Sequence, residues 1–245
     1  MKLLSYMLFS FLILFFTTQT TFAQDSLEVS KQKAKEVIEK YLTAIGGKEA
    51  IKNTQDRTTI MRGTAMGQNI TIIAKKKAPN KMRKEIKDRR IDQVIIFDGE
   101  KGVMNIKKQK IEVKDKELEA LKIEASMDFM LDPESFGIKI FYEGTEKLDG
   151  KDVNKIKMIM PSGLRSFSYF DSESGLKLKE QKEMQTQMGL GEQTLVYEDY
   201  REIEGVKYPH KIIQSFGGQS IEVTVSSIKV NKGLADDLFV ISEWS

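Results

Sequence analysis

The chain has 245 residues and a formal net charge of +3 at pH 7, and it contains one histidine and no cysteine. The lack of cysteine excludes disulfides and thiolate metal sites, and the single histidine excludes multi-histidine metal sites. No phosphate-binding glycine loop or dinucleotide fingerprint is present, so we expect neither a metal ion nor a cofactor.

Residues 1–23 have the pattern of a secretory signal peptide. Lys2 gives a positive start, Leu3 to Phe16 form an almost unbroken apolar run, and Thr21-Phe22-Ala23 has small residues at the two positions that a signal peptidase reads. The run is shorter than the about 20 apolar residues of a transmembrane helix, and no cysteine follows to carry a lipid anchor. We therefore expect cleavage near Ala23, a periplasmic protein without a membrane anchor, and a single domain over residues 24–245.

An amphipathic helix is expected at the start of the mature chain. Its apolar residues have the spacing of one buried helical stripe. They are Ala34, Val37, Ile38, Tyr41, Leu42 and Ile45. Gly46-Gly47 ends this helix. Alternating segments between turn residues then predict strands over residues 57–65, 68–76, 81–87, 91–97 and 103–113, with an interruption in the last one left open.

A second helical segment is predicted from about Asp115 to Leu131, where Pro133 ends it. Its apolar residues occupy two opposite faces. Strands follow at residues 138–147, 153–160, 164–171, 176–186, 193–203, 206–216 and 220–230. A change in the phase of alternation predicts a β-bulge near Ser226-Ser227. No helix long enough for a parallel crossover separates these strands, so the pattern indicates an antiparallel meander.

The predicted fold is mainly β (α+β): one large antiparallel sheet of about eleven or twelve strands with two helical segments. So many strands in one sheet must curl, close or split into two layers. A curled sheet has a concave face that the helices can cover, and the enclosed space need not be filled. Ten methionines follow the signal segment, and their flexible side chains suit an adaptable apolar lining, although methionine is also an ordinary core residue.

Few residues are suited to catalysis. His210 alternates with Val206, Tyr208 and Ile212, so it is either a general base in a cavity or, as we favour, a partly buried histidine bonded to a neighbour. A hydrolase that acts on envelope components is therefore one alternative, but we do not expect an enzyme.

Basic side chains are concentrated between Lys75 and Lys110, where thirteen Lys or Arg residues accompany five Asp or Glu residues. Lys81, Arg83 and Lys87 share one strand face and form a candidate docking surface, although such a face is more often simply solvated. An envelope sensor or interaction module that binds a protein through this surface is our alternative function. Nucleic acid is not an expected partner of an exported protein.

Three short motifs mark turns and the end of the predicted sheet. They are Lys77-Ala78-Pro79-Asn80, Phe97-Asp98-Gly99-Glu100-Lys101 and Leu238-Phe239-Val240. With the order of the elements, they make residues 34–240 resemble the LolA/LolB-like family of periplasmic lipoprotein carriers, which has a Lys-Arg-Pro-Asn turn, an Asp-Gly hairpin and a terminal Phe-containing strand. This chain has Ala78 where the family has Arg. The resemblance implies that the family's Arg latches a lid over the cavity, so Ala78 is a departure from the pattern.

The resemblance implies an unclosed antiparallel barrel whose concave apolar face, covered by helices, holds acyl chains of lipids or lipoproteins in transit toward the outer membrane. Each buried CH₂ contributes about 0.8 kcal/mol, so such binding needs no catalytic group. The expected cavity lining is Ile60, Ile72, Val94, Ile96, Met158, Met160, Tyr169 and Leu178. The expected lid is Leu121, Ala125, Met127, Phe129, Met130 and Leu131. We expect a monomer, with envelope proteins as donor or acceptor of the cargo.

Overall fold

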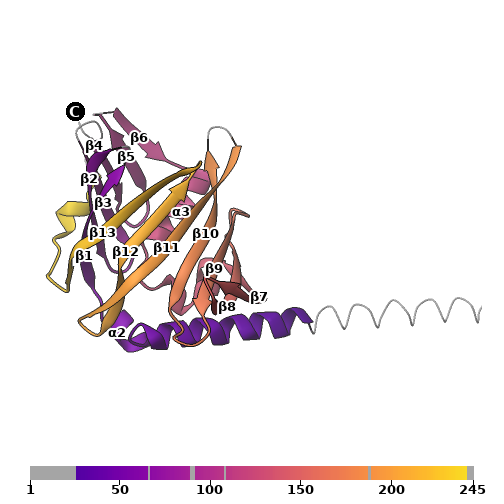
Figure 1. Cartoon of the computed structure of the whole chain (residues 1–245). Coiled ribbons are helices and arrows are strands. Elements are labelled where there is room, and N and C mark those ends of the chain that lie inside the picture. Colours follow the sequence, from indigo (N-terminus) through magenta and orange to yellow (C-terminus); the bar gives the residue numbers. More distant parts are fainter. Residues whose placement is uncertain (1–25, 66, 89–91, 108, 187–188, 242–245) are drawn as a thin grey trace, which may run out of the picture.

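The computed structural model describes residues 26–65, 67–88, 92–107, 109–186 and 189–241. The predicted signal peptide over residues 1–23 and its cleavage site lie outside these residues. Within them, a helix over residues 26–44, here the N-terminal helix, and a short helix α2 (Lys48–Lys52) precede a single large sheet (Figure 1). No helix in the described part of the chain is long and apolar enough to cross a membrane.

Thirteen antiparallel strands form this sheet. In the first half they are β1 (Asp56–Ala65), β2 (Gln68–Lys77), β3 (Lys81–Lys87), β4 (Asp92–Phe97), β5 (Gly102–Ile106) and β6 (Gln109–Val113). In the second half they are β7 (Lys139–Leu148), β8 (Lys151–Ile159), β9 (Arg165–Asp171), β10 (Lys177–Thr186), β11 (Gly189–Ile203), β12 (Val206–Phe216) and β13 (Gln219–Val230). Each half is a meander, and pairing of β1 with β13 joins the two halves. The sheet is not closed, and β6 and β7 are its edges.

The observed strands follow the predicted segments closely. The twelve predicted segments become thirteen strands because Lys107 adopts a φ of 47° and turns the chain between β5 and β6. The predicted bulge is confirmed at Ser226. Here Ile60 pairs with Ser227 and Met61 with Val225, so Ser226 is the extra residue, and its hydroxyl donates to the Ile60 carbonyl oxygen at 3.1 Å.

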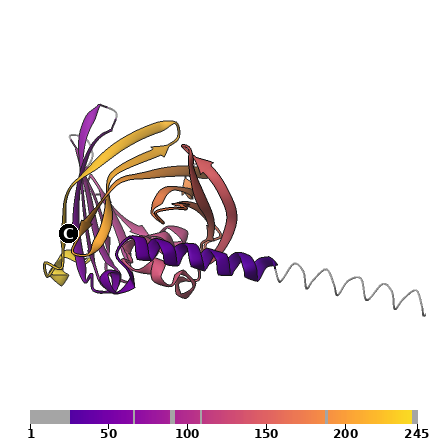
Figure 2. The same ribbon diagram turned by 60° about the horizontal axis from the view of Figure 1, so that its bottom comes forward.

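The sheet is curved, and the helical segments lie across the open side of the curve (Figure 2). Helix α3 (Asp115–Ala125) and the 3₁₀ turns η1 (Phe129–Leu131) and η2 (Pro133–Phe136) connect edge strand β6 to edge strand β7. The predicted mainly β fold, an open curved sheet with few helices, is therefore confirmed.

The prediction of one helix from Asp115 to Leu131 is wrong at its C-terminal end. Helix α3 ends at Ala125 because Ser126 is extended, with φ −60° and ψ 140°. The Ser126 hydroxyl donates to the Asp128 carboxylate at 2.8 Å, and the Asp128 N–H donates back to that hydroxyl oxygen at 3.2 Å. Such local side-chain bonds compete with helical hydrogen bonding, and the chain continues as the turns η1 and η2.

The N-terminal helix packs against strands of the second half of the sheet. The buried cluster that it forms is Ala34, Val37, Ile38, Leu42, Ile45, Ile51, Ile138, Ile140, Ile156, Met158, Phe170 and Val206. At the end of the helix, the Lys207 N–H donates to the Ile45 carbonyl oxygen at 2.8 Å. Gly46 permits this approach, because a Cβ on it would lie 2.0 Å from the Gly205 carbonyl oxygen.

The C-terminal segment packs on the opposite side of the sheet. Its 3₁₀ turn η3 (Asp236–Phe239) contacts β3, and the Asp236 carboxylate accepts hydrogen bonds from Lys77 at 2.9 Å and Lys81 at 2.8 Å. Phe239 is buried. We call this side of the sheet the convex face and the side with the helices the concave face. Directly paired residues of neighbouring strands lie on the same face, and successive residues along one strand alternate between the two faces.

Candidate functional site

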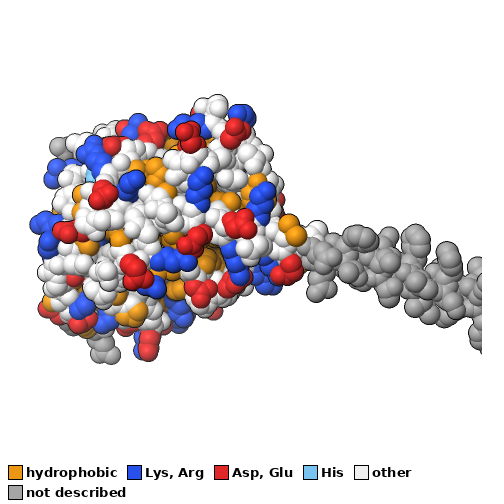
Figure 3. Space-filling view, turned by 90° about the horizontal axis from the view of Figure 1, so that it is seen from below, with side chains coloured by type: hydrophobic (Ala, Val, Ile, Leu, Met, Phe, Trp, Pro, Cys, Tyr) orange, Lys and Arg blue, Asp and Glu red, His pale blue; other side chains and the backbone are white. Residues whose placement is uncertain are grey.

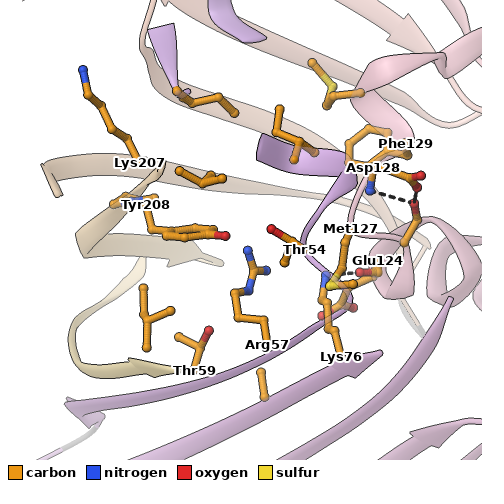
Figure 4. Close-up of a pocket in the computed structure, with 18 of the residues that line it drawn as sticks. Thr54, Arg57, Thr59, Lys76, Glu124, Met127, Asp128, Phe129, Lys207 and Tyr208 are labelled. Carbon is orange, nitrogen blue, oxygen red and sulfur yellow. Dashed lines mark hydrogen bonds between the residues drawn. The ribbon is translucent and has the colours of Figure 1, made fainter. Parts of the chain in front are cut away.

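A cavity of about 380 Å³ lies between the concave face and the helical segments (Figure 4). This volume is within the range of small-molecule pockets. Its apolar lining comes from the N-terminal helix, α2, strands of both halves and the segment before η2: Leu42, Ile45, Ile51, Met61, Met82, Met127, Phe129, Met130, Leu131, Val206, Ile212, Val225 and Ile228. The cavity can therefore accept an apolar chain against flexible methionine side chains.

The same cavity carries charged side chains. Five are basic and two are acidic: Arg57, Lys76, Lys84, Lys177 and Lys207, with Glu124 and Asp128. Figure 4 places Arg57 on β1 beside Thr54 and Tyr208, and Lys76 beside Met127 and Glu124. The Arg57 guanidinium lies over the Tyr208 ring, 4.8 Å from its centroid, in a cation–π contact. The cavity is amphipathic, with an excess of positive charge.

Two of these lysines pair with carboxylates. Lys84 Nζ lies 2.8 Å from the Glu124 carboxylate, and the charge of Lys84 holds the pKa of Glu124 down at about 2. Lys177 Nζ lies 3.0 Å from the Glu180 carboxylate, which also accepts hydrogen bonds from the Tyr197 hydroxyl at 2.9 Å and the Ser166 hydroxyl at 3.2 Å. Burial alone would raise the pKa of Glu180, but the charges of Lys177 and Lys182 hold it well below its usual range. These ion pairs neutralise Lys84 and Lys177.

Arg57 and Lys76 are not neutralised in this way. None of the ion pairs among the described residues includes either side chain. The Lys76 ammonium instead donates to the backbone carbonyl oxygen of Glu124, at the end of α3. Burial, assisted by the nearby charge of Arg57, lowers the pKa of Lys76 to about 7. At neutral pH this lysine therefore exchanges between charged and neutral forms.

The eight residues predicted to line the cavity are divided between the two faces. Ile72 shares the concave face with its pairing partner Met61, and Met158 belongs to the cluster under the N-terminal helix, against which Met160 also packs. Strand register places Ile60, Val94, Ile96 and Tyr169 on the convex face, and Leu178 falls where the β9–β10 register shifts. None of the eight lines the cavity described here.

The six predicted lid residues all lie over the concave face, but in two groups. Leu121 and Ala125 of α3 are buried with Met82 and Phe97. The other four line the cavity directly: Met127, Phe129, Met130 and Leu131. The segment 126–131 therefore forms the cavity wall opposite β1 and β2, whereas α3 packs closely against β3 and β4.

The predicted docking residues lie on the convex face, and each has an acidic neighbour. Lys81 pairs with Asp236, as described above. Arg83 and Lys87 both pair with Glu85, at 2.8 Å and 2.9 Å. Viewed from the side that carries the N-terminal helix, the molecule also shows Lys/Arg and Asp/Glu side chains interspersed (Figure 3).

His210 is buried, and its Nδ1 lies 3.0 Å from the Tyr208 carbonyl oxygen. It does not line the cavity. Arg57, Lys76 and Tyr208 do line the cavity, but they were not singled out from the sequence. No sequence signal sets the first two apart, since Arg57 is the second residue of β1 and Lys76 is the middle of the run Lys75-Lys76-Lys77 at the end of β2.

No protein-family model matches the sequence, and no curated protein matches it either. Solved structures do resemble it. A LolA superfamily protein from Nitrosomonas europaea superimposes with a TM-score of 0.57 and 16% identity, over 84% of this chain and 97% of that one. A protein domain from Vibrio parahaemolyticus, described as a putative outer membrane lipoprotein-sorting protein domain, superimposes with a TM-score of 0.55 and 14% identity. The match covers 85% of this chain and 97% of that one.

A DUF1329 family protein from Desulfovibrio piger is similar to the same extent, with a TM-score of 0.55 and 12% identity over 85% of this chain and 97% of that one. At such identities the likeness concerns the fold alone. The chain has a LolA-like fold, which confirms the resemblance inferred from its motifs at this level.

Proposed function

We propose that the protein is a periplasmic carrier that binds acyl chains of lipids or lipoproteins in the cavity and shuttles them toward the outer membrane. The observation that carries the proposal is the cavity of about 380 Å³, whose walls include Met61, Met82, Met127 and Met130. Burial of CH₂ groups there, at about 0.8 kcal/mol each, supplies affinity without a reaction. The LolA-like fold supports the proposal, and the signal-peptide pattern of residues 1–23 supports the location.

Release of a buried chain requires a wall that moves, and we assign this role to the segment 126–131. It contains no regular α-helix, and η2 beyond it is tied to the N-terminal helix by the Lys35–Glu134 ion pair at 2.8 Å. Exposed ion pairs of this kind are weak, on the order of 0–1 kcal/mol. Movement of the segment therefore meets little electrostatic resistance there.

Filling the cavity should weaken the binding of an acyl chain. Ala74 lies on β2 and lines the cavity, so Ala74→Trp places a large ring in the space that an acyl chain would take. We expect at least a tenfold loss of affinity for a fluorescent fatty-acid probe, or about 1.4 kcal/mol. Lys75→Trp is the matched control, because this neighbour faces the convex side.

The parent protein should take up the probe, and native mass spectrometry of protein purified from the periplasm should show bound lipid. The absence of both bound lipid and probe uptake would contradict the carrier proposal. Equal probe affinity in the two tryptophan variants would place the binding site elsewhere.

A further inference from the structure

Arg57 and Lys76 form an unusual pair on the concave face. They are direct cross-strand partners on β1 and β2, and both line the cavity. Like charges directly opposite each other on neighbouring strands are destabilising. Lys84 and Lys177 of the same cavity each have a carboxylate partner, whereas no ion pair among the described residues neutralises Arg57 or Lys76.

Tyr208 and Glu124 contact this pair, but neither forms an ion pair with it among the described residues. One side of the Arg57 guanidinium is covered by the Tyr208 ring, and Met61, Thr59 and Val225 line the cavity farther along β1 and β13. A cationic group beside an apolar lining matches, in charge and polarity, a molecule with an anionic end and an apolar chain. The mixed charges of the face in Figure 3 show no comparable excess of positive charge.

We propose that the ligand of the cavity is an anionic amphiphile, whose carboxylate or phosphate group binds between Arg57 and Lys76 while its acyl chain lies along the methionine-lined walls. This inference rests on the proposed carrier function and names its ligand class. The anion offsets the repulsion between the two cations, and Arg57 holds it by charge-assisted hydrogen bonds. The Lys76 ammonium then has a partner besides the carbonyl oxygen of Glu124.

The test compares two ligands with the same chain: hexadecanoic acid and hexadecanol. Hydrogen bonds to charged groups are stronger than those between neutral groups, so we expect the acid to bind the parent protein at least about tenfold more tightly. Arg57→Gln and Lys76→Met should each reduce this preference, and the double variant should bind the two ligands equally. Inorganic phosphate and acetate, which lack a chain, should not bind measurably at millimolar concentration.

Arg62→Gln is the matched control, since Arg62 lies on β1 but faces the convex side. It should keep the preference for the acid. Affinity for the alcohol, measured in every variant, reports whether the cavity is intact. A variant that binds the alcohol normally and has lost the preference for the acid therefore supports the inference without any ambiguity from misfolding.

The preference should also depend on pH, because burial lowers the pKa of Lys76 to about 7. The charged groups that act on it are Arg57 on β1, Lys84 on β3 and Lys182 on β10, which lower this pKa, and Glu124 on α3, which raises it. Lys76 is charged below about pH 7 and loses its proton above it in the free protein, so affinity for the acid should fall as the pH rises above about 7 while affinity for the alcohol stays constant.

The outcomes separate the two proposals. If neither ligand binds, the carrier function fails. If the acid and the alcohol bind the parent protein equally, the carrier function stands and the anionic ligand class is wrong. If phosphate alone binds as tightly as the acid, the site is a simple anion site, and the inference is also overturned.

Discussion

Gly46→Ala is expected to destabilise the protein by about 3 kcal/mol or more, the sum of backbone strain and overpacking. Gly46 adopts a φ of 126°, which L-residues rarely do, and its Cβ would lie 2.0 Å from the Gly205 carbonyl oxygen. The overlap is with backbone, so the end of the N-terminal helix must move away from the β11–β12 turn. Urea denaturation followed by circular dichroism measures the change.

Gly47→Ala provides the control for Gly46→Ala. Gly47 also has a positive φ, of 87°, but no neighbouring atom lies within 4 Å of the place that a Cβ would take. This variant should therefore show backbone strain alone, about 1–3 kcal/mol. If the two variants were equally stable, the close approach to Gly205 would not contribute, and the coupling of the helix to β12 would have to be abandoned.

Glu180→Leu should destabilise the protein by about 3–5 kcal/mol, because it leaves Lys177 charged in a largely buried position. The two side chains are only 13% and 14% exposed, and their ion pair is 3.0 Å long. Tyr197 and Ser166 lose their acceptor in the same change. Thermal or urea unfolding of the variant gives the loss directly.

The double variant Lys177→Met/Glu180→Leu separates charge from packing. It removes both charges and should recover most of the stability lost in Glu180→Leu. Replacing a buried ion pair with apolar residues often leaves the stability of a protein unchanged or raises it. A double variant as unstable as the single one would show that the hydrogen bonds of Tyr197 and Ser166, rather than the ion pair, dominate.

The pH dependence of Glu180 follows from the same contacts. Its pKa in the folded protein is depressed below the ordinary value of 4.5, so below that pH the unfolded chain binds a proton that the folded chain does not. Its contribution to stability is therefore complete above about pH 4.5 and decreases as the pH falls. Glu180→Leu should show a smaller loss of stability on acidification than the parent protein.

Strand positions could be predicted from sequence because turn residues and alternation are local signals. Asp98-Gly99, Asp149-Gly150 and Glu204-Gly205 lie at the turns that they predict, and the phase change at Ser226 corresponds to a real bulge. The extent of the lid helix was less predictable. Its C-terminal end depends on a hydrogen bond between Ser126 and Asp128, which a helical wheel does not reveal.

Which face of the sheet points toward the cavity could not be read from alternation, because several strands are apolar on both faces. Ile60 is followed by Met61, Ile72 by Ile73 and Ile95 by Ile96. The convex face buries apolar side chains too: Ile96 is 1% exposed, as is Phe239 of the C-terminal segment. Alternation of apolar and polar residues identifies the buried face of a strand only when the other face is exposed to solvent. Along β1–β4 both faces of this sheet are partly covered, so alternation does not identify the concave one.

The central pairing of β1 with β13 has a consequence for how the chain folds. The two strands meet across a long separation in sequence, as in the bond from Ser226 to Ile60, 166 positions apart. Each meander can form from neighbouring hairpins, but the seam between them closes only when the last strand is present, and such distant contacts slow folding. Until then β1 lacks a partner along one side, and so does β12. We therefore expect a newly synthesised chain to remain prone to aggregation until its final strand is present.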